Sequence, residues 1–200
     1  MSFLNKQLLL VLSILCVFAV AGCTRDDTSN QILPMCLSAD QQQIIDLVST
    51  NVQQILLFEF NTTEPFNEVG VRLEVYEYGV LTETKLGFAK LGMDAPLDGS
   101  ISVIIIENDG TFDWTVTLHD DGGFSSSRTT TAVKEGLNAR AFGAMNEAVN
   151  IYDGTDAVIF VSRFTNDSSL TAGGDLQSYL NPDNFASYPL VHVLIANFVQ

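Results

Sequence analysis

The sequence predicts a mainly β protein: an antiparallel β-sandwich, jelly-roll-like or Ig-like, of about eight or nine strands with one short N-terminal helix. Three observations support this fold class. Apolar and polar residues alternate along much of the chain, as in VGVRLEVYEYG at residues 69–79, and this two-residue period is typical of strands. Asp-Gly pairs, which favour tight turns, separate several of these segments. Apolar residues make up 46% of the chain and charged residues 16%, as in a globular domain.

The first 22 residues have the pattern of an export signal. Lys6 supplies a basic start, and the segment LLLVLSILCVFAV at residues 8–20 is almost wholly apolar. A transmembrane helix needs about 20 apolar residues, so this segment is too short to span a bilayer comfortably. Its length instead fits the apolar core of a signal peptide, and the small residues Ala21 and Gly22 follow it, as a signal peptidase requires.

The residues Val20-Ala21-Gly22-Cys23 resemble a lipobox, the motif of bacterial lipoproteins with a type II signal peptide. The resemblance covers about a tenth of the chain, and Val20 stands where the motif usually has leucine. It implies that the thiol of Cys23 receives a diacylglyceryl group and that cleavage makes Cys23 the new N-terminus. Two or more acyl chains hold a protein stably on a bilayer. We therefore expect a protein anchored to the cell membrane and facing the extracytoplasmic side.

The expected domain organisation has three parts: a signal peptide at 1–22, a lipidated N-terminus and flexible tether at 23–36, and a single β-sandwich domain at 37–200. The segment TRDDTSNQILP at 24–34 is polar and contains a proline, as a tether would. Of the three cysteines, Cys16 lies in the signal peptide and Cys23 is the acylation site, which leaves Cys36. One cysteine cannot form an intrachain disulfide, so the domain must be held together by its core.

The segment LSADQQQIIDLVSTNV at 37–52 predicts one amphipathic helix. Ser38 is the expected N-cap, and Gln41, three residues later, completes a capping box. Ile44, Leu47 and Val48 fall on one face at helical spacing, together with Asn51. We expect this apolar stripe to be buried against the strands that follow.

A β-hairpin is expected where Asp109-Gly110 joins SISVIIIEN to TFDWTVTLH, because this dipeptide is preferred in type I′ turns. If these two residues form the turn, Ile105 pairs with Trp114 and the apolar faces of both strands align. Trp114 is therefore expected in the core. The region 136–148 is ambiguous, since its Ala, Met and Glu residues favour a helix but two glycines interrupt it. Further strands are expected at residues 54–61, 68–79, 81–91, 124–133, 147–151, 157–164 and 190–199, and a looser connection with one helical turn before Pro182 at 165–189.

Charge and motifs limit the classes of function. The net charge of -15 repels phosphate backbones, so we expect no nucleic-acid partner. Catalysis needs a placed nucleophile, base or metal, and the chain has two histidines, His119 and His192, and none of the common catalytic motifs. A site built from Cys36 and both histidines would require the fold to bring them together. We therefore expect no enzymatic activity, no catalytic residues and no cofactor.

Tyr76 and Tyr78 are the best candidates for binding a ligand. If Val71 to Val75 face the core in alternation, both tyrosines lie on the solvent face beside Arg72 and Glu74. Aromatic rings with charged neighbours suit sugars or peptides, although packing between strands also explains tyrosines on a sheet. A carbohydrate-binding module that uses this face is one alternative function.

A metal-assisted hydrolase is a second alternative, since clustered carboxylates bind hard cations. The nearest pairs lie in the Asp-Gly turns, but none fits the calcium loop of an EF-hand, and hairpins use Asp-Gly without any metal, so we assign no metal ligand. The aspartate pairs are Asp109/Asp113, Asp120/Asp121 and Asp153/Asp156.

The function we expect is that of a lipid-anchored extracytoplasmic protein without enzymatic activity. Its expected partners are the membrane, through Cys23, and an unknown envelope protein or glycan.

Overall fold

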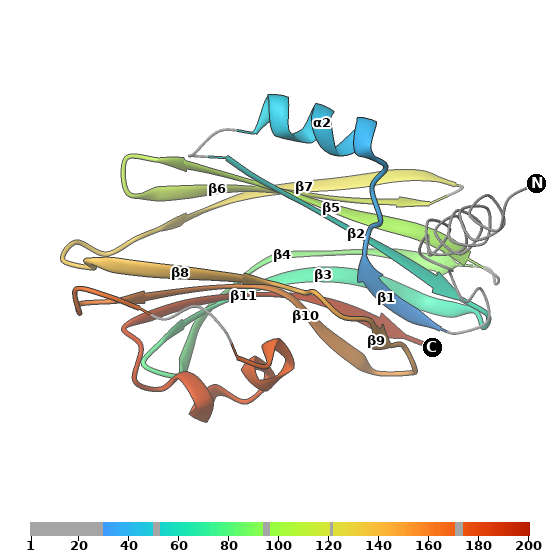
Figure 1. The fold of residues 1–200 in the computed structure, drawn as a ribbon. Helices are drawn as coiled ribbons and strands as arrows, with labels where there is room; N and C mark the ends of the chain where they lie inside the picture. Colours follow the sequence, from blue (N-terminus) through green and yellow to red (C-terminus); the bar gives the residue numbers. More distant parts are fainter. Residues whose placement is uncertain (1–29, 50–52, 94–96, 121, 171–173) are drawn as a thin grey trace, which may run out of the picture.

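The computed structural model describes residues 30–49, 53–93, 97–120, 122–170 and 174–200, and in them two antiparallel sheets pack face to face (Figure 1). The strand order is β7-β6-β5-β2-β1-β9 in the six-stranded sheet and β4-β3-β11-β10-β8 in the five-stranded sheet. The protein is thus a mainly β sandwich, as the sequence predicts. The predicted signal peptide and Cys23 lie outside the described residues. The strands are β1 (Gln31–Pro34), β2 (Gln53–Thr62), β3 (Phe66–Glu77), β4 (Val80–Met93), β5 (Leu97–Asn108), β6 (Thr111–Asp120), β7 (Gly123–Ala132), β8 (Ala139–Ala144), β9 (Val149–Asn150), β10 (Thr155–Thr165) and β11 (Leu190–Val199).

The hairpin β5–β6 has the predicted turn and register. Asp109 and Gly110 have φ values of 39° and 78°, and positive φ at both central residues defines a type I′ turn. Asn108 pairs with Thr111 and Ile105 with Trp114. Local turn chemistry and side-chain alternation were therefore sufficient to fix this part of the sheet.

The core between the two sheets is rich in aromatic rings. Trp114 is 1% exposed, which confirms its predicted core position, and its ring meets that of Phe160 edge-on with centroids 5.8 Å apart. At another point of the sandwich, Phe60 of the six-stranded sheet meets Phe198 of the five-stranded sheet, with centroids 5.6 Å apart. The two layers are thus joined by direct ring contacts between facing strands.

β1 corrects the predicted tether. Gln31–Pro34 is a strand that pairs with β2 on one side and β9 on the other, so the domain begins within the range 23–36 expected to be flexible. Ile32 is fully buried and fills part of the core, which explains why this segment joins the sheet. Four residues are too few to show a clear alternation of apolar and polar side chains. Pro34 also argues against a strand assignment from sequence, because proline has no N–H to donate to a neighbouring strand.

β8 resolves the ambiguous region 136–148. Ala139–Ala144 is a strand on the edge of the five-stranded sheet, paired with β10 from Phe160 to Thr165. Its helix-forming composition is overridden by this pairing. Gly143 lies close to the chain that crosses it, since a Cβ there would be 3.3 Å from Leu176.

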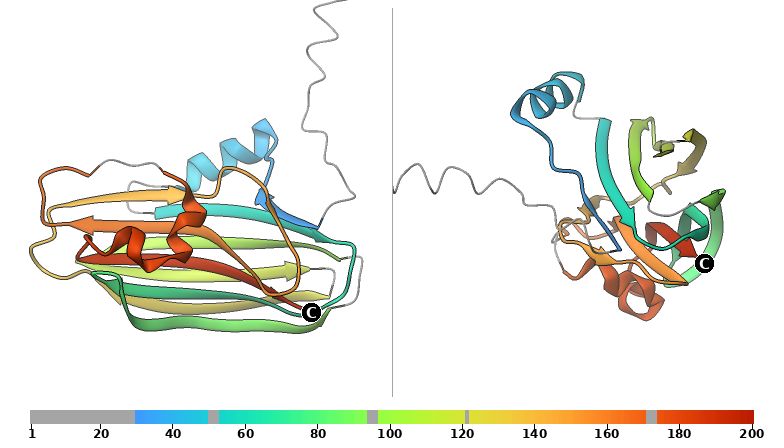
Figure 2. Two further views of the ribbon diagram at one scale, coloured as in Figure 1. Left: turned by 90° about the horizontal axis from the view of Figure 1, so that it is seen from below. Right: turned by 90° about the vertical axis from the view of Figure 1, so that its right-hand side faces the viewer.

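Three helical segments complete the fold: α2 (Ala39–Val48) and the 3₁₀ helices η1 (Leu176–Leu180) and η2 (Pro182–Phe185). The predicted capping box is present at α2, where the Ser38 hydroxyl accepts from the Gln41 N–H and the Gln41 side chain accepts from the Ser38 N–H. η1 and η2 lie on the outer side of the five-stranded sheet (Figure 2, left), and α2 lies on the outer side of the six-stranded sheet (Figure 1). None of the helices in the described ranges combines the length and the apolar character needed to cross a bilayer.

Candidate functional site

The β3 face predicted to bind a ligand is largely covered. Arg72, Glu74 and Tyr76 share one face of β3, as alternation predicts, but Tyr76 is only 7% exposed, so its expected place in solvent was wrong. The cause is η2, whose Phe185 ring meets the Tyr76 ring with centroids 4.9 Å apart. η1 and η2 together build a second apolar layer on the outer side of the sheet. Its buried members are Tyr76, Val158, Val161, Tyr179, Phe185, Val191, Val193 and Ile195.

Tyr78 does not share a surface with Tyr76. It leaves the strand at the β3–β4 turn with φ 49°, is 58% exposed, and its N–H donates to the Tyr188 carbonyl oxygen at 3.0 Å. The turn continues through Gly79 at φ 77°, where an added Cβ would lie 3.1 Å from Ala186. The turn is therefore packed against the chain after η2, and the predicted pair of exposed rings does not form.

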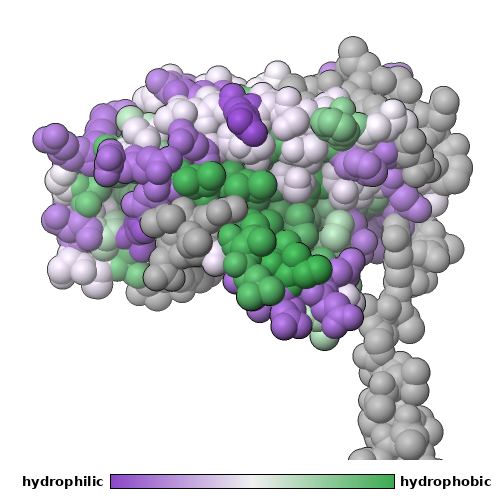
Figure 3. Space-filling view, turned by 90° about the horizontal axis from the view of Figure 1, so that it is seen from above, coloured by the Kyte–Doolittle hydropathy of each residue, from purple (hydrophilic) through white to green (hydrophobic). Residues whose placement is uncertain are grey.

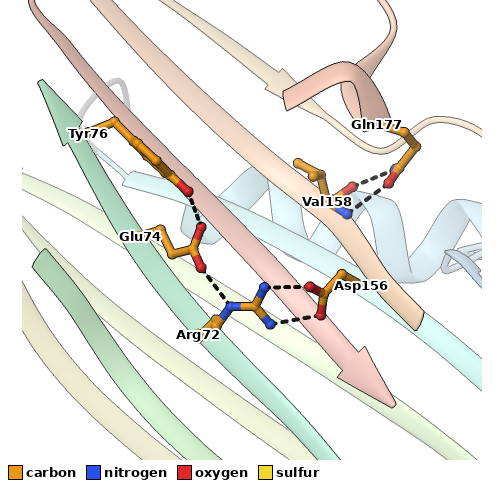
Figure 4. Close-up of polar contacts among 6 residues, drawn as sticks. All are labelled: Arg72, Glu74, Tyr76, Asp156, Val158 and Gln177. Carbon is orange, nitrogen blue, oxygen red and sulfur yellow. Dashed lines mark hydrogen bonds and ion pairs between the residues drawn. The ribbon is translucent and has the colours of Figure 1, made fainter. Parts of the chain in front are cut away.

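The charged groups beside Tyr76 are connected in one continuous series of hydrogen bonds, which is called the network below (Figure 4). Arg72 donates from Nη1 and Nη2 to the two carboxylate oxygens of Asp156 at 2.8 and 2.6 Å, and from Nε to Glu74 Oε1 at 2.8 Å. The Tyr76 hydroxyl donates to Glu74 Oε2 at 2.5 Å. The hydrogen bonds to Asp156 raise the pKa of Arg72, and burial, followed by the hydrogen bond to Glu74, raises the pKa of Tyr76.

This network has a structural role. Asp156 lies on β10 and Arg72 on β3, with β11 between them, so the bidentate pair joins two strands across a third. Nearby, Gln177 of η1 donates from Nε2 to the Val158 carbonyl and accepts from the Val158 N–H, both at 2.9 Å (Figure 4). Gln177 thus fixes η1 to the sheet, and three of the four side chains that the sequence assigned to a ligand, Arg72, Glu74 and Tyr76, are already bound to each other.

Replacing Arg72 with methionine should lower the free energy of unfolding by about 1–2 kcal/mol, because two adjacent carboxylates lose their shared cation in a partly exposed setting. Urea denaturation of both proteins measures the loss. Arg128→Met is the matched control, since Arg128 is exposed on the opposite sheet and its replacement should change stability little. An Arg72→Met variant as stable as the wild type would contradict the structural role.

The side chains considered for nucleophilic catalysis do not come together. His119 is exposed on the outer side of the six-stranded sheet, paired with Ser100 and Phe124, and Cys36 is exposed between β1 and α2. His192 is fully buried in the core. A joint site of these three residues is therefore not formed.

His192 does lie beside a serine. Its Nδ1 is 3.1 Å from Ser162 Oγ on the neighbouring strand, and its ring is enclosed by Phe112, Trp114 and Phe164. Burial, with a smaller contribution from the positive charge of Lys85, lowers the pKa of His192 to about 3. Ser162 is 1% exposed, and His192 Nε2 has no hydrogen-bond partner among the residues that the structure describes. A substrate cannot reach this pair, so its chemistry is that of a neutral, enclosed imidazole.

The carboxylates of the Asp-Gly turns bind groups of the chain itself. Asp113 accepts from Thr130 Oγ1 at 2.7 Å and from Asn108 Nδ2 at 3.0 Å, and the hydrogen bond from Thr130 lowers its pKa. Asp153 accepts from the Gln200 N–H at 2.8 Å. Asp121 lies outside the described residues. In the part of the chain that the structure describes, no three His, Cys, Asp or Glu side chains are grouped as metal ligands would be.

A cavity of about 420 Å³ lies at one end of the sandwich, under the chain that joins β7 to β8. The Arg140 guanidinium lies over the Phe112 and Phe142 rings, 5.7 and 5.3 Å from their centroids, and pairs with Glu107 at 2.5 Å. Lys134, also on the wall, pairs with Glu77. Sequence reasoning missed this cavity, because its lining comes from three separate segments.

α2 presents its apolar stripe to solvent. The side chains of Ile44, Leu47 and Val48 are 60%, 77% and 51% exposed, and α2 has no buried residue, so the expectation that this stripe would be buried was wrong. Helical spacing reports that a face is apolar, but it does not report whether another element covers that face. Gln42 and Asp46 form one hydrogen bond along the helix, at 2.7 Å.

The outer side of the six-stranded sheet carries a second apolar strip next to α2. Ile55 and Leu57 of β2 alternate with the buried Phe58, and Ile104 and Ile106 of β5 alternate with the buried Ile105. Ile55 pairs directly with Ile104. Figure 3 shows hydrophobic side chains gathered at the middle of this side of the molecule, with polar side chains around them. The name α2 surface is used below for Ile44, Leu47, Val48, Ile55, Leu57, Ile104 and Ile106.

A model of the YgaN domain matches residues 31–189, which is most of the chain. The chain belongs to the YgaN domain family. No curated protein and no solved structure matches it. The matched region of the YgaN domain begins with β1 and contains both α2 and the η1–η2 layer. It ends before β11, although β11 pairs with β3 and β10 in the middle of the five-stranded sheet.

Proposed function

We propose that this YgaN-domain protein is a lipid-anchored extracytoplasmic binding protein without catalytic activity. The observation that carries the binding role is the α2 surface. Soluble domains rarely leave a contiguous apolar area open, and such areas are typical of contact sites for other proteins. Of the side chains with catalytic chemistry, His192 is enclosed, Arg72, Glu74 and Asp156 are engaged with each other, and the exposed Cys36 and His119 lie on separate parts of the fold.

The anchoring role rests on Cys23 and the apolar signal before it. Acylation of Cys23 would place the domain close to the bilayer, because Cys23 and the first residue of β1 are separated by eight positions, which span at most about 29 Å. The strong negative charge keeps the domain soluble and repels it from acidic lipid headgroups. The anchored domain would therefore present its surfaces to other envelope components.

The carbohydrate-binding alternative has less support, because Tyr76 is covered by Phe185 and offers no open ring. Of the four residues predicted to bind a ligand, only Tyr78 is exposed. Arg72 and Glu74 are hydrogen-bonded to each other. The metal-assisted alternative would need ligands that converge, and the turn carboxylates accept hydrogen bonds from separate parts of the chain.

Metabolic labelling with an alkyne fatty acid in a bacterial host tests the anchor. We expect label on the wild-type protein and none on Cys23→Ser, with the latter released from the membrane fraction. Cys36→Ser is the matched control, because Cys36 is an exposed cysteine between β1 and α2 and its replacement should not affect labelling. Equal labelling of Cys23→Ser and the wild type, or an intact signal segment in the mature protein by mass spectrometry, would reject the anchoring role.

A further inference from the structure

α2 is too short to be stable by its own interactions. It has 10 residues, and helices shorter than about 12–15 residues are marginal in water without tertiary packing. Its capping box and the Gln42–Asp46 hydrogen bond help to start and extend the helix, but none of its side chains is buried. A partner that covers the apolar stripe of α2 would therefore supply the tertiary packing that stabilises the helix.

The charges around the α2 surface have one dominant sign. Asp40 and Asp46 lie on α2, which has no basic residue in its last turn, and Asp113 lies on the outer side of β6. Arg128 on β7 is the single lysine or arginine that the outer faces of β2, β5, β6 and β7 contribute within the described residues, and His119 lies on the outer face of β6. A depression of about 480 Å³ shares Ile104 and Ile106 with this surface, and its other lining residues are Asp113, Trp114, Thr115, Arg128, Thr129 and Thr130.

We propose that the α2 surface binds an apolar, cationic segment of a partner protein. The inference rests on the proposed binding function and names the chemistry of the partner. The apolar side chains supply contact area, and the aspartates around them favour lysine or arginine on the partner and disfavour acidic surfaces. A second copy of this chain carries the same charge of -15, and an acidic bilayer is also negative, so both are repelled where a cationic segment is attracted.

Binding is measured with the full chain in nanodiscs of zwitterionic lipid and two dye-labelled amphipathic peptides, one of leucine and lysine and one of leucine and glutamate. We expect the leucine–lysine peptide to bind, with an affinity that falls as salt is raised, and the leucine–glutamate peptide not to bind. Empty nanodiscs give the background. Equal binding of both peptides would overturn the proposal.

Two pairs of variants locate the site. Ile44→Ser with Leu47→Ser should weaken binding at least about tenfold, since two aliphatic side chains leave the contact. Val80→Ser with Leu81→Ser is the matched control, because these exposed apolar residues lie at the β3–β4 hairpin and should leave binding within about twofold. The fold is not at risk, because α2 contributes no buried side chain, and an unchanged unfolding midpoint checks this.

The charges are tested in the same way. Asp40→Asn with Asp46→Asn should weaken binding several-fold and reduce its salt dependence, whereas Asp153→Asn with Asp183→Asn removes equal charge elsewhere and should not. If both charge pairs weaken binding equally, the peptide binds by net charge alone and the proposed site is wrong.

Two further results would show that the α2 surface binds a membrane or a second copy of the chain, and either would overturn the proposal. One is binding of the Cys23→Ser chain to anionic vesicles that is lost with Ile44→Ser and Leu47→Ser. The other is a dimer in sedimentation that the same substitutions dissociate. The same peptides are also tested on the non-acylated Cys23→Ser chain in solution, so a failure of the fatty-acid labelling test and a failure of this proposal are distinguishable.

Discussion

Replacement of Trp114 by alanine is expected to lower the free energy of unfolding by about 3–5 kcal/mol, since a large buried ring is lost and a cavity remains. The ring is 1% exposed and lies against Phe160 and His192 at centroid distances of 5.8 and 5.7 Å. Domains of this size are stable by about 5–15 kcal/mol in total, so the variant should unfold at much lower urea concentration. Far-UV circular dichroism follows the transition, because Trp114 is the only tryptophan and the variant has no such fluorophore.

A Trp114→Phe control separates packing from hydrogen bonding. The indole N–H donates to Thr131 Oγ1 at 2.9 Å, and Thr131 is 2% exposed. Phenylalanine keeps most of the ring but leaves the threonine hydroxyl without this donor, so a smaller loss of about 1–2 kcal/mol is expected. A loss below about 1 kcal/mol in the alanine variant would show that the ring does not fill the core.

Acidification is expected to destabilise the protein through His192. The folded state holds the pKa of His192 at about 3, below the usual value of 6.5, because the ring is buried. Between these two values the unfolded chain binds a proton that the folded protein excludes, so stability falls as pH decreases through 6.5 and levels off below about 3. From about pH 7.5 to about pH 5 the loss should be about 2 kcal/mol.

Urea denaturation across this range measures the effect above the pH at which most carboxylates titrate. A His192→Leu variant should lose most of the pH dependence, whatever its absolute stability. His119→Gln is the matched control, because His119 is exposed and should leave the dependence unchanged. A wild-type protein equally stable at both pH values would show that His192 is not enclosed as the structure has it.

Patterns confined to neighbouring residues were read correctly from the sequence. The Asp109-Gly110 turn fixed the register of β5 and β6, and the pair Ser38 and Gln41 fixed the start of α2. Both signals depend on backbone and side-chain groups a few residues apart, and distant parts of the chain do not alter them. The sandwich class itself followed from the repetition of such signals.

Features that depend on distant segments were missed. Arg72 and Glu74 gave β3 a polar outer face, and only the fold reveals that Phe185, far along the chain, covers Tyr76 beside them. One signal was present: apart from His192, residues 190–196 of β11 are apolar on both faces, which is typical of a strand buried on both sides. That pattern required an additional layer outside the sheet, and the loop at 165–189 was the segment available to form it.

The position of β1 determines how tension on the anchored end of the chain would reach the domain. If Cys23 is acylated, any pull from the membrane enters the fold at Gln31. β1 is an interior strand, so drawing it out breaks its hydrogen bonds to β2 and β9 together and removes Ile32 from the core. A strand at the edge of the sheet would have hydrogen bonds to one neighbouring strand only, and these could break one at a time. Under such an anchor, the load would reach the sandwich at a strand that is held on both sides.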